Sequence, residues 1–198
     1  MNNVEQSIEN MHLESQLSLE DIPELSLYMD QVIQLFENKF ADTKRNEHEK
    51  VLTKTMINNY AKGKLFFPIK NKKYSREHLM LISMIYQMKG SLSINDVKQT
   101  LEKLNQKLME EECNLQDIYK SYLKLDEDNV DLFTNAVYEH LDAVHHEVQQ
   151  LDDDNQDYVE QLLMIAVLTN MSNYYRRAAE KMVDAIGNEK IDQKGQQL

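Results

Sequence analysis

The amino-acid sequence predicts an all-α protein, and three observations lead to this fold class. Only four Gly and two Pro occur in 198 residues, so few positions would break a helix. Apolar residues recur at three- and four-residue spacing through most of the chain, as they do in amphipathic helices. The composition, with 41% hydrophobic and 28% charged residues, is that of a globular chain long enough to bury a core.

The N-terminal part begins with a polar, acidic segment, residues 1–16, that we expect to be a flexible tail and not a secretory signal. A helix is predicted from about Pro23 to Phe40, with Asp21 as a plausible cap and Pro23 in the first turn. Residues 41–50 are polar and form either a connector or a short helix of their own.

The helix predicted between Thr53 and Gly63 has a polar face suited to nucleic acid. Thr53 is a good N-cap because its hydroxyl can accept from a free backbone N–H, and Gly63 tolerates the left-handed conformation of a helix end. At roughly 100° per residue, the apolar face is formed by Met56, Ile57, Tyr60 and Ala61. The polar face is formed by Thr55, Asn58, Asn59 and Lys62, with Lys54 at its edge. Asparagine can pair with adenine and lysine can neutralise phosphate, although an ordinary solvated face has the same composition.

A short basic segment follows this helix. Pro68 ends any helix and forces Phe67 into an extended conformation. The run closes with three lysines and a tyrosine: Lys70, Lys72, Lys73 and Tyr74. We expect a basic hairpin or loop, a wing, that clamps the phosphate backbone beside the helix, although many lysine-rich loops are only solvated.

Net charge separates this region from the rest of the chain. Residues 44–76 hold ten Lys or Arg and two Glu, a net charge of +8, whereas the whole chain has 22 basic and 34 acidic residues. The other residues therefore include 12 basic and 32 acidic side chains, a net charge of −20. A basic region in an acidic chain indicates an anionic partner.

Two more helices are predicted after the wing. Ser75 caps a helix that is apolar on nearly every side and therefore buried, and Gly90 ends it. Ser93 caps the following helix, with Asp96 at the capping-box position.

A heptad pattern starts within the second of these helices. Its apolar positions are Ile94, Val97, Leu101, Leu104, Leu108, Leu115, Ile118, Tyr122 and Leu125, with a fault at Glu111. The pattern fits one long dimerisation helix, or two helices broken near Cys113 and Asn114. We favour the break, because charge fills the gap and Asn114 is a common cap type.

The C-terminal part predicts two long helices. Residues 125–131 have the composition of a turn, with Asp128 or Asn129 capping a helix whose apolar stripe runs over residues 130–151. Residues 152–155 reverse the chain, and a last helix extends over about residues 156–186. The Tyr-Tyr-Arg-Arg run at 174–177 could contact a ligand, but an amphipathic helix end explains it as well.

Three motifs, TMINNYAKGKLFFP, KKY and SLSINDVKQTL, occur in this order and resemble the MerR type of winged helix-turn-helix regulator. In that family a Thr-Ile/Leu-Arg-Tyr-Tyr helix leads to a Leu-Leu-Pro wing, followed by a tyrosine, a leucine-rich helix and a Gly-Phe-Ser-Leu-x-x-Ile helix start. The matching positions are Met56, Ile57, Asn58, Tyr60, Lys62, Pro68, Tyr74, Ser93 and Val97. Asn59 stands where the family has its first tyrosine, and the family's Gly-Tyr-Arg wing tip is absent from this sequence. The resemblance implies a winged helix-turn-helix followed by helices that dimerise.

The runs LSLYMDQVIQLFENKF, LTKTMINNYAKGKLFFP and KKYSREHLM are similar to the bacterial domain-of-unknown-function family numbered 1836. The similarity spans residues 22–104. That group is considered MerR-like, and it implies no particular ligand or operator.

The sequence carries little that indicates enzyme chemistry. It has no phosphate loop, Rossmann fingerprint or nucleophile elbow. Asp142 and His145 have a spacing that can bind a metal, but a helical di-metal site needs a second such pair. The acidic clusters at Asp126 and Asp152 lack the glycine of a calcium loop. We therefore expect no enzymatic activity, cofactor or metal. Cys113, the single cysteine, fits a reducing cytoplasm.

These observations predict a sequence-specific DNA-binding regulator of the MerR-like type, and the alternative is a helix-turn-helix fold reused as a protein-interaction module. The expected partners are double-stranded DNA, a second copy in a homodimer and an unidentified effector. We expect no membrane partner, because the longest apolar run, residues 162–168, is too short to span a bilayer.

The expected domains are a tail (1–16), a winged helix-turn-helix domain (17–108), a helical dimerisation or effector region (109–187) and a second tail (188–198). The residues expected to contact DNA are Lys54, Thr55, Asn58, Asn59, Lys62, Lys64, Lys70, Lys72, Lys73, Tyr74 and Arg76.

Overall fold

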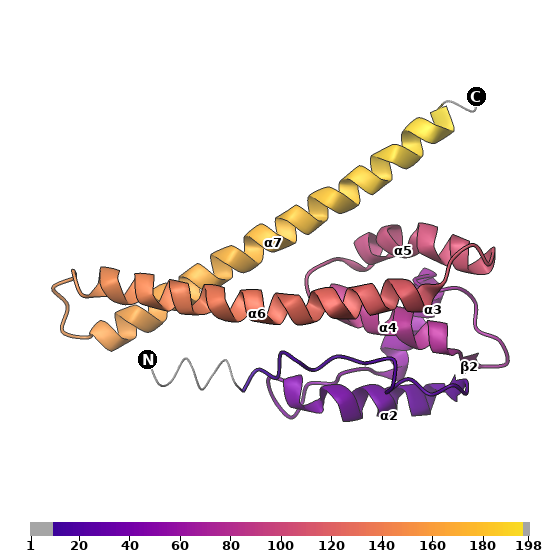
Figure 1. Ribbon diagram of the computed structural model, residues 1–198, viewed down its shortest axis with the longest axis horizontal. Coiled ribbons are helices and arrows are strands. Elements are labelled where there is room, and N and C mark those ends of the chain that lie inside the picture. The colour runs from indigo at the N-terminus through magenta and orange to yellow at the C-terminus, as the bar shows by residue number, and fades with distance from the viewer. Residues whose placement is uncertain (1–9, 196–198) are drawn as a thin grey trace.

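The computed structural model describes residues 10–195, and the side chains of residues 10–188. In this part of the chain it has six α-helices, one short 3-10 helix and one two-stranded sheet, which confirms the predicted all-α class (Figure 1). The two expected tails fall partly on residues 1–9 and 196–198, which lie outside the described residues.

The elements in chain order are β1 (Leu27–Tyr28), α2 (Met29–Phe40), η1 (Ala41–Thr43), α3 (Lys54–Gly63), β2 (Lys73–Tyr74), α4 (Arg76–Met88), α5 (Ile94–Met109), α6 (Leu115–Val148) and α7 (Gln156–Gly195). The strands pair antiparallel, with Leu27 opposite Tyr74. The segment after α3 is therefore held against the segment that enters α2.

Helix α2 begins at Met29, so the prediction that it begins near Pro23 was wrong. Asp21 caps a turn instead of a helix, because its carboxylate accepts from the backbone N–H of Ser18 at 2.9 Å. The same carboxylate lies 2.8 Å from Lys39 Nζ, and the charge and hydrogen bonds of its neighbours lower the pKa of Asp21 despite its partial burial. Residues 22–26 form bends and irregular chain, and Leu27 and Tyr28 form β1, which pairs with β2.

The predicted N-caps of three helices are confirmed. Thr53 Oγ1 accepts from the backbone N–H of Met56 at 3.1 Å, and Ser75 is the N-cap of α4. Ser93 and Asp96 form the expected capping box, in which each side chain accepts from the backbone N–H of the other at 3.1–3.2 Å. These bonds satisfy N–H groups that a helix start leaves free.

The end of α3 differs from the prediction at Gly63. Lys64, with a φ of 58°, adopts the left-handed conformation, and Gly63 is the last residue of the helix. A Cβ atom on Gly63 would lie 2.7 Å from the side chain of Leu65. The glycine therefore permits close packing, while its neighbour takes the strained conformation.

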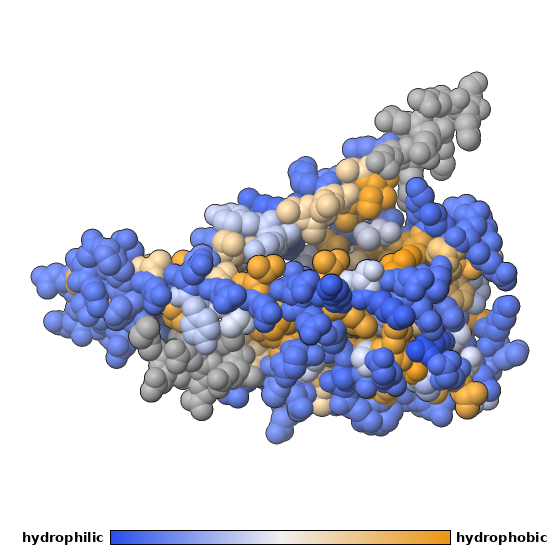
Figure 2. Space-filling view, in the orientation of Figure 1, coloured by the Kyte–Doolittle hydropathy of each residue, from blue (hydrophilic) through white to orange (hydrophobic). Residues whose placement is uncertain are grey.

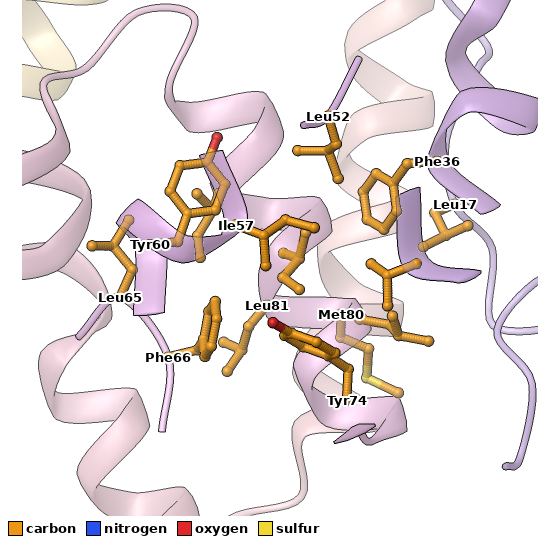
Figure 3. Close-up of a cluster of buried hydrophobic side chains, with 14 of the residues drawn as sticks. Leu17, Phe36, Leu52, Ile57, Tyr60, Leu65, Phe66, Tyr74, Met80 and Leu81 are labelled. Carbon is orange, nitrogen blue, oxygen red and sulfur yellow. The ribbon is translucent and has the colours of Figure 1, made fainter. Parts of the chain in front are cut away.

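One hydrophobic core holds together the part of the chain from Leu17 to Tyr119. Helix α4 lies at its centre and is buried on nearly every side, as predicted. Figure 3 shows Ile57 and Tyr60 of α3 and Tyr74 of β2 directed into this cluster. The core also includes Leu115 and Tyr119 of α6, beyond residue 108, where we expected this domain to end.

The predicted break between α5 and α6 is confirmed. Glu111 has a φ of 56°, and Asn114 caps α6 by accepting from the backbone N–H of Gln116 at 3.0 Å. The turn predicted at residues 125–131 was wrong, since α6 continues through it. No Gly or Pro occurs in α6, and its acidic residues can remain helical because they lie at or near the surface.

Helices α6 and α7 form a long hairpin, and residues 152–155 reverse the chain as predicted. Val144 and Val148 of α6 pack with Met164 of α7 in a second, smaller core near the reversal. The two helices then diverge, and the far part of α7 approaches α5 (Figure 1). Helix α7 ends at Gly195, later than the predicted end near residue 186.

Candidate nucleic-acid interface

Helix α3 presents the predicted polar face to solvent. Lys54, Thr55, Asn58, Asn59 and Lys62 are all exposed. Ala61, which we expected on the inner face, is exposed as well. The exposed face therefore combines two amides, a hydroxyl and two ammonium groups, with one methyl group beside them.

The opposite face fixes the orientation of α3. Ile57 is fully buried and Tyr60 is 3% exposed, and both belong to the main core (Figure 3). Burial raises the pKa of Tyr60 to about 12. A helix that is anchored in this way presents its polar side chains in a fixed direction, which recognition of base edges requires.

The segment after α3 forms a tight hairpin, here called the basic turn (Lys70, Asn71, Lys72 and Lys73). The backbone N–H of Lys73 donates to the carbonyl of Lys70 at 2.9 Å. Asn71 and Lys72 have φ values of 52° and 58°, and two positive values at the central positions define a type I′ turn. The turn holds three ammonium groups next to β2.

Two lysines of the candidate interface occupy left-handed backbone positions. Lys64 follows α3 and Lys72 lies at the tip of the basic turn, and each has a φ of 58°. This conformation costs a non-glycine residue roughly 1–2 kcal/mol, and glycine or asparagine is the usual choice. A charged side chain therefore replaces the conformationally easier residue at both positions.

The lysines of the interface differ in their partners. Within the described part of the chain, Lys62, Lys64, Lys70 and Lys72 form no salt bridge. Lys73 Nζ lies 5.0 Å from the centre of the Tyr28 ring, a cation–π contact.

Lys54, at the edge of the α3 face, pairs with Asp30 of α2 at a distance of 2.7 Å. Both side chains are well exposed, at 64% and 73%. An exposed pair of this kind contributes little stability, so Lys54 can exchange Asp30 for a phosphate at small cost.

Two predicted contact residues lie elsewhere. Tyr74 is 1% exposed and packs edge-on against Phe66, with ring centres 6.2 Å apart. The guanidinium of Arg76 donates to the carbonyl of Leu19 at 2.8 Å and pairs with Glu24. The structure therefore brings neither side chain to the exposed face of α3 and the basic turn.

Sequence reasoning missed three residues that shape this surface. Tyr28 contacts Lys73, and Asp30 pairs with Lys54, but both are distant from the basic region in sequence. His78 bonds to the two ends of the loop that carries the basic turn. Asn71 offered one usable signal, because asparagine tolerates the left-handed conformation of a type I′ turn.

Other sites considered in the sequence carry no comparable arrangement. Asp142 and His145 lie on α6, and His145 Nδ1 is 3.6 Å from Glu160 of α7. Within residues 10–195, no three His, Cys, Asp or Glu side chains form a group that could hold a metal ion. None of the helices in this range is both long and apolar enough to cross a bilayer.

Comparison with known proteins identifies the family. No curated protein and no solved structure matches the chain. The family model described as "Domain of unknown function (DUF1836)" matches residues 17–122. This span is more than half of the chain and contains β1, β2, α2 to α5 and the start of α6, which together form the main core. The chain therefore belongs to the DUF1836 family.

Proposed function

We propose that this protein is a sequence-specific, DNA-binding transcriptional regulator with a winged helix-turn-helix of the MerR-like type. The observation that carries the proposal is the exposed face of α3, on a helix anchored by Ile57 and Tyr60. Asn58 and Asn59 lie there beside Lys62, which forms no salt bridge with any other described residue. In this proposal α3 enters the major groove and the basic turn contacts the phosphate backbone as a wing.

The chemistry of the exposed side chains supports a division of roles. In the major groove, adenine presents an acceptor at N7 and a donor at N6–H₂, and an asparagine side chain can match both, because its amide N–H donates to N7 while its amide oxygen accepts from N6–H₂. The lysines can neutralise phosphates, which gives affinity without sequence preference. Asn58, Asn59 and Thr55 are therefore assigned to base contacts, and Lys62, Lys64, Lys70 and Lys72 to phosphates.

Selection of bound fragments from a random double-stranded pool, followed by titration at several salt concentrations, tests the proposal. We expect an enriched motif and an affinity that falls with salt, with a slope of about −0.9 per phosphate contacted. Replacing Lys70 and Lys72 by alanine should lower affinity and reduce the slope. The matched control replaces Lys120 and Lys124, two exposed lysines of α6, and should change neither.

The alternative function, a protein-interaction module, predicts a different result. An acidic protein surface could use the same lysines, but it would not select bases. The absence of an enriched motif, together with no measurable DNA affinity at low salt, would overturn the regulator proposal and leave the alternative.

We also propose that the protein acts as a homodimer, because α7 carries an uncovered apolar strip. Tyr158, Leu162 and Ile165 are 59%, 49% and 65% exposed. Their four- and three-residue spacing places them on one side of α7, opposite Leu163 and Val167, which pack towards α6. Figure 2 shows further hydrophobic surface on the later part of α7, where this helix diverges from α6. A second copy would cover this strip and supply a second α3 for a paired half-site.

Two further expectations belong to this proposal. A DNA-binding regulator must share a compartment with the DNA. In a bacterial cell this is the cytoplasm, the location expected from the single cysteine. It also needs a signal, and α6 and α7 are the part of the chain available to receive an effector.

A further inference from the structure

An apolar cavity lies between α6 and α7, on the side of the second core where the two helices diverge. Its volume is about 600 Å³, which is within the range of small-molecule sites. Phe133 and Val137 of α6 and Leu168 and Met171 of α7 contribute apolar walls, and Met11 closes one side. The cavity is formed by three separate segments and not by a single helix face.

The lining indicates which ligand chemistry would fit. The polar groups among the lining residues are the side chains of Asn129 and His140 of α6 and the hydroxyls of Ser172 and Tyr175 of α7. None of the described residues that line it is Asp, Glu, Lys or Arg, although 28% of the chain is charged. A charged ligand would lose its hydration without gaining a partner, so the lining favours an uncharged apolar molecule with one or two hydrogen-bonding groups.

Helix α7 connects this cavity to α5. The side-chain amide of Gln99 on α5 donates to the carbonyl of Val183 on α7 at 2.6 Å, and Val183 is buried. A Cβ atom on Gly187 would lie 2.5 Å from the same amide. This amide is the far end of a flexible side chain, and its contacts with Val183 and Gly187 mark the place where α5 and α7 meet.

Helix α5 in turn contacts the end of α3. The buried side chain of Asn105 donates to the carbonyl of Leu65 at 2.9 Å, directly after the left-handed Lys64. Val97 and Leu101 of α5 belong to the same core as Ile57. A change in the angle between α6 and α7 would thus act on α5, which packs against α3.

We propose that the cavity between α6 and α7 binds a small uncharged apolar effector, and that its occupancy changes DNA affinity through α7 and α5. The regulatory part rests on the proposed function, whereas the binding part does not. A ligand shifts an equilibrium only if it prefers one conformation, so the effector must favour one separation of α6 and α7 over another.

The binding part is tested with N-phenyl-1-naphthylamine, an uncharged dye that fluoresces in apolar surroundings. We expect saturable binding of one dye per chain in the full-length protein. Ala136→Trp fills the cavity from α6, and Ser172→Trp fills it from α7, where position 172 is exposed and the variant should fold. Both should abolish the saturable signal, while Ala143→Trp, at an exposed position of α6, should keep it.

Sedimentation of the same variants tests the alternative that a second copy of the chain covers the cavity. If the dye does not saturate, or binds both filled variants as it binds the wild type, the ligand proposal is overturned. If the filled variants instead change the oligomeric state while the wild type binds no dye, a second copy covers the cavity, and the ligand proposal fails.

The regulatory part is tested by measuring DNA affinity with and without saturating dye. We expect a change of at least about fivefold in the wild type. The change should be lost in Gln99→Ala, whose dye binding should remain. Equal DNA affinity with and without dye would overturn the coupling. Absence of DNA binding in every condition would overturn both the proposed function and the coupling. It would not affect the proposed binding of the dye in the cavity.

Discussion

The imidazole of His78 is bonded to the backbone of Phe67, with His78 Nε2 3.1 Å from the Phe67 carbonyl oxygen. The backbone N–H of Ser75 donates to His78 Nδ1 at 3.1 Å, so Nδ1 accepts and Nε2 carries the proton. The Phe67 ring also packs on the imidazole, with centres 4.0 Å apart. One neutral histidine therefore connects the two ends of the loop that carries the basic turn.

The first prediction concerns the pH dependence of folding. Burial lowers the pKa of His78 below its usual value of 6.5, although the Phe67 carbonyl acts in the opposite direction. The unfolded chain takes up this proton near pH 6.5 and the folded chain only at lower pH. The free energy of unfolding should therefore fall as the pH drops below 6.5, and be insensitive to His78 above it.

Urea unfolding between about pH 7.5 and pH 5 measures this effect. His78→Gln should be less stable than the wild type at neutral pH and should lose part of the pH dependence. His48→Gln, at an exposed loop position, should keep the wild-type dependence. Parallel pH profiles for the wild type and His78→Gln would contradict the assignment.

The second prediction separates charge from backbone strain at the tip of the basic turn. Lys72→Gly removes the ammonium group and relieves the left-handed conformation, so the variant should be more stable by up to about 1 kcal/mol. Lys72→Ala removes the same charge without the relief. Both should lose DNA affinity equally in titrations at fixed salt. Wild-type affinity in the glycine variant would mean that this lysine does not contact phosphate.

Much of the helical fold could be predicted from the sequence because its signals are local. Caps such as Thr53 and Ser93 act within three residues, and the buried face of α4 follows from periodicity alone. The start of α2 could not be predicted in the same way. Leu27 and Tyr28 are held in a strand by pairing with β2, which is about 45 residues away, and local sequence propensity does not indicate a partner at that distance.

The candidate interface was predictable in composition but not in detail. The exposure of Asn58 and Asn59 follows from helical angles. The burial of Tyr74 and the pairing of Arg76 with Glu24 depend on how β1 and the segment before it fold back. In α6, a local signal was misleading: residues 125–131 have the composition of a turn, but the helix continues through them. Acidic residues whose side chains can cap a helix are also compatible with the exposed face of one.

The third prediction compares two buried tyrosines. Within the described residues, the hydroxyl of Tyr60 has no hydrogen-bond partner, whereas that of Tyr119 donates to the carbonyl of Leu17 at 2.6 Å. Tyr60→Phe should be neutral or stabilising, because no bond is lost. Tyr119→Phe should cost about 1–3 kcal/mol, because a buried carbonyl is left unpaired. Urea unfolding of the two variants measures the difference, and equal costs would contradict it.

The fourth prediction tests the uncovered strip on α7. Leu162→Glu places a charge at the middle of the strip and should convert a dimer into a monomer, because burying an unpaired carboxylate is unfavourable. Asn170→Glu adds the same charge at an exposed position off the strip and should leave the dimer intact. Sedimentation equilibrium at micromolar protein concentrations distinguishes the dimer from the monomer. A wild-type chain that remains a 23.4 kDa species, with or without DNA, would rule out the dimer.

The last prediction assigns base recognition to α3. Asn58 is exposed between Ile57, which anchors the helix, and Asn59. Loss of a bidentate base contact costs about 1–3 kcal/mol of discrimination, or roughly 5- to 150-fold. Asn58→Ala should therefore relax the preference at one base pair of the selected motif and leave affinity for unrelated DNA unchanged. Competition titrations with single-base variants of the motif measure this preference.

Lys62→Ala is the matched control on the same helix, because Lys62 is exposed and should contact phosphate only. It should weaken binding to all sequences by a similar factor and reduce the dependence on salt. If Asn58→Ala and Asn59→Ala both keep the full preference of the wild type, α3 does not read the bases. The lysines would then serve a partner recognised by charge alone, as the protein-interaction alternative requires.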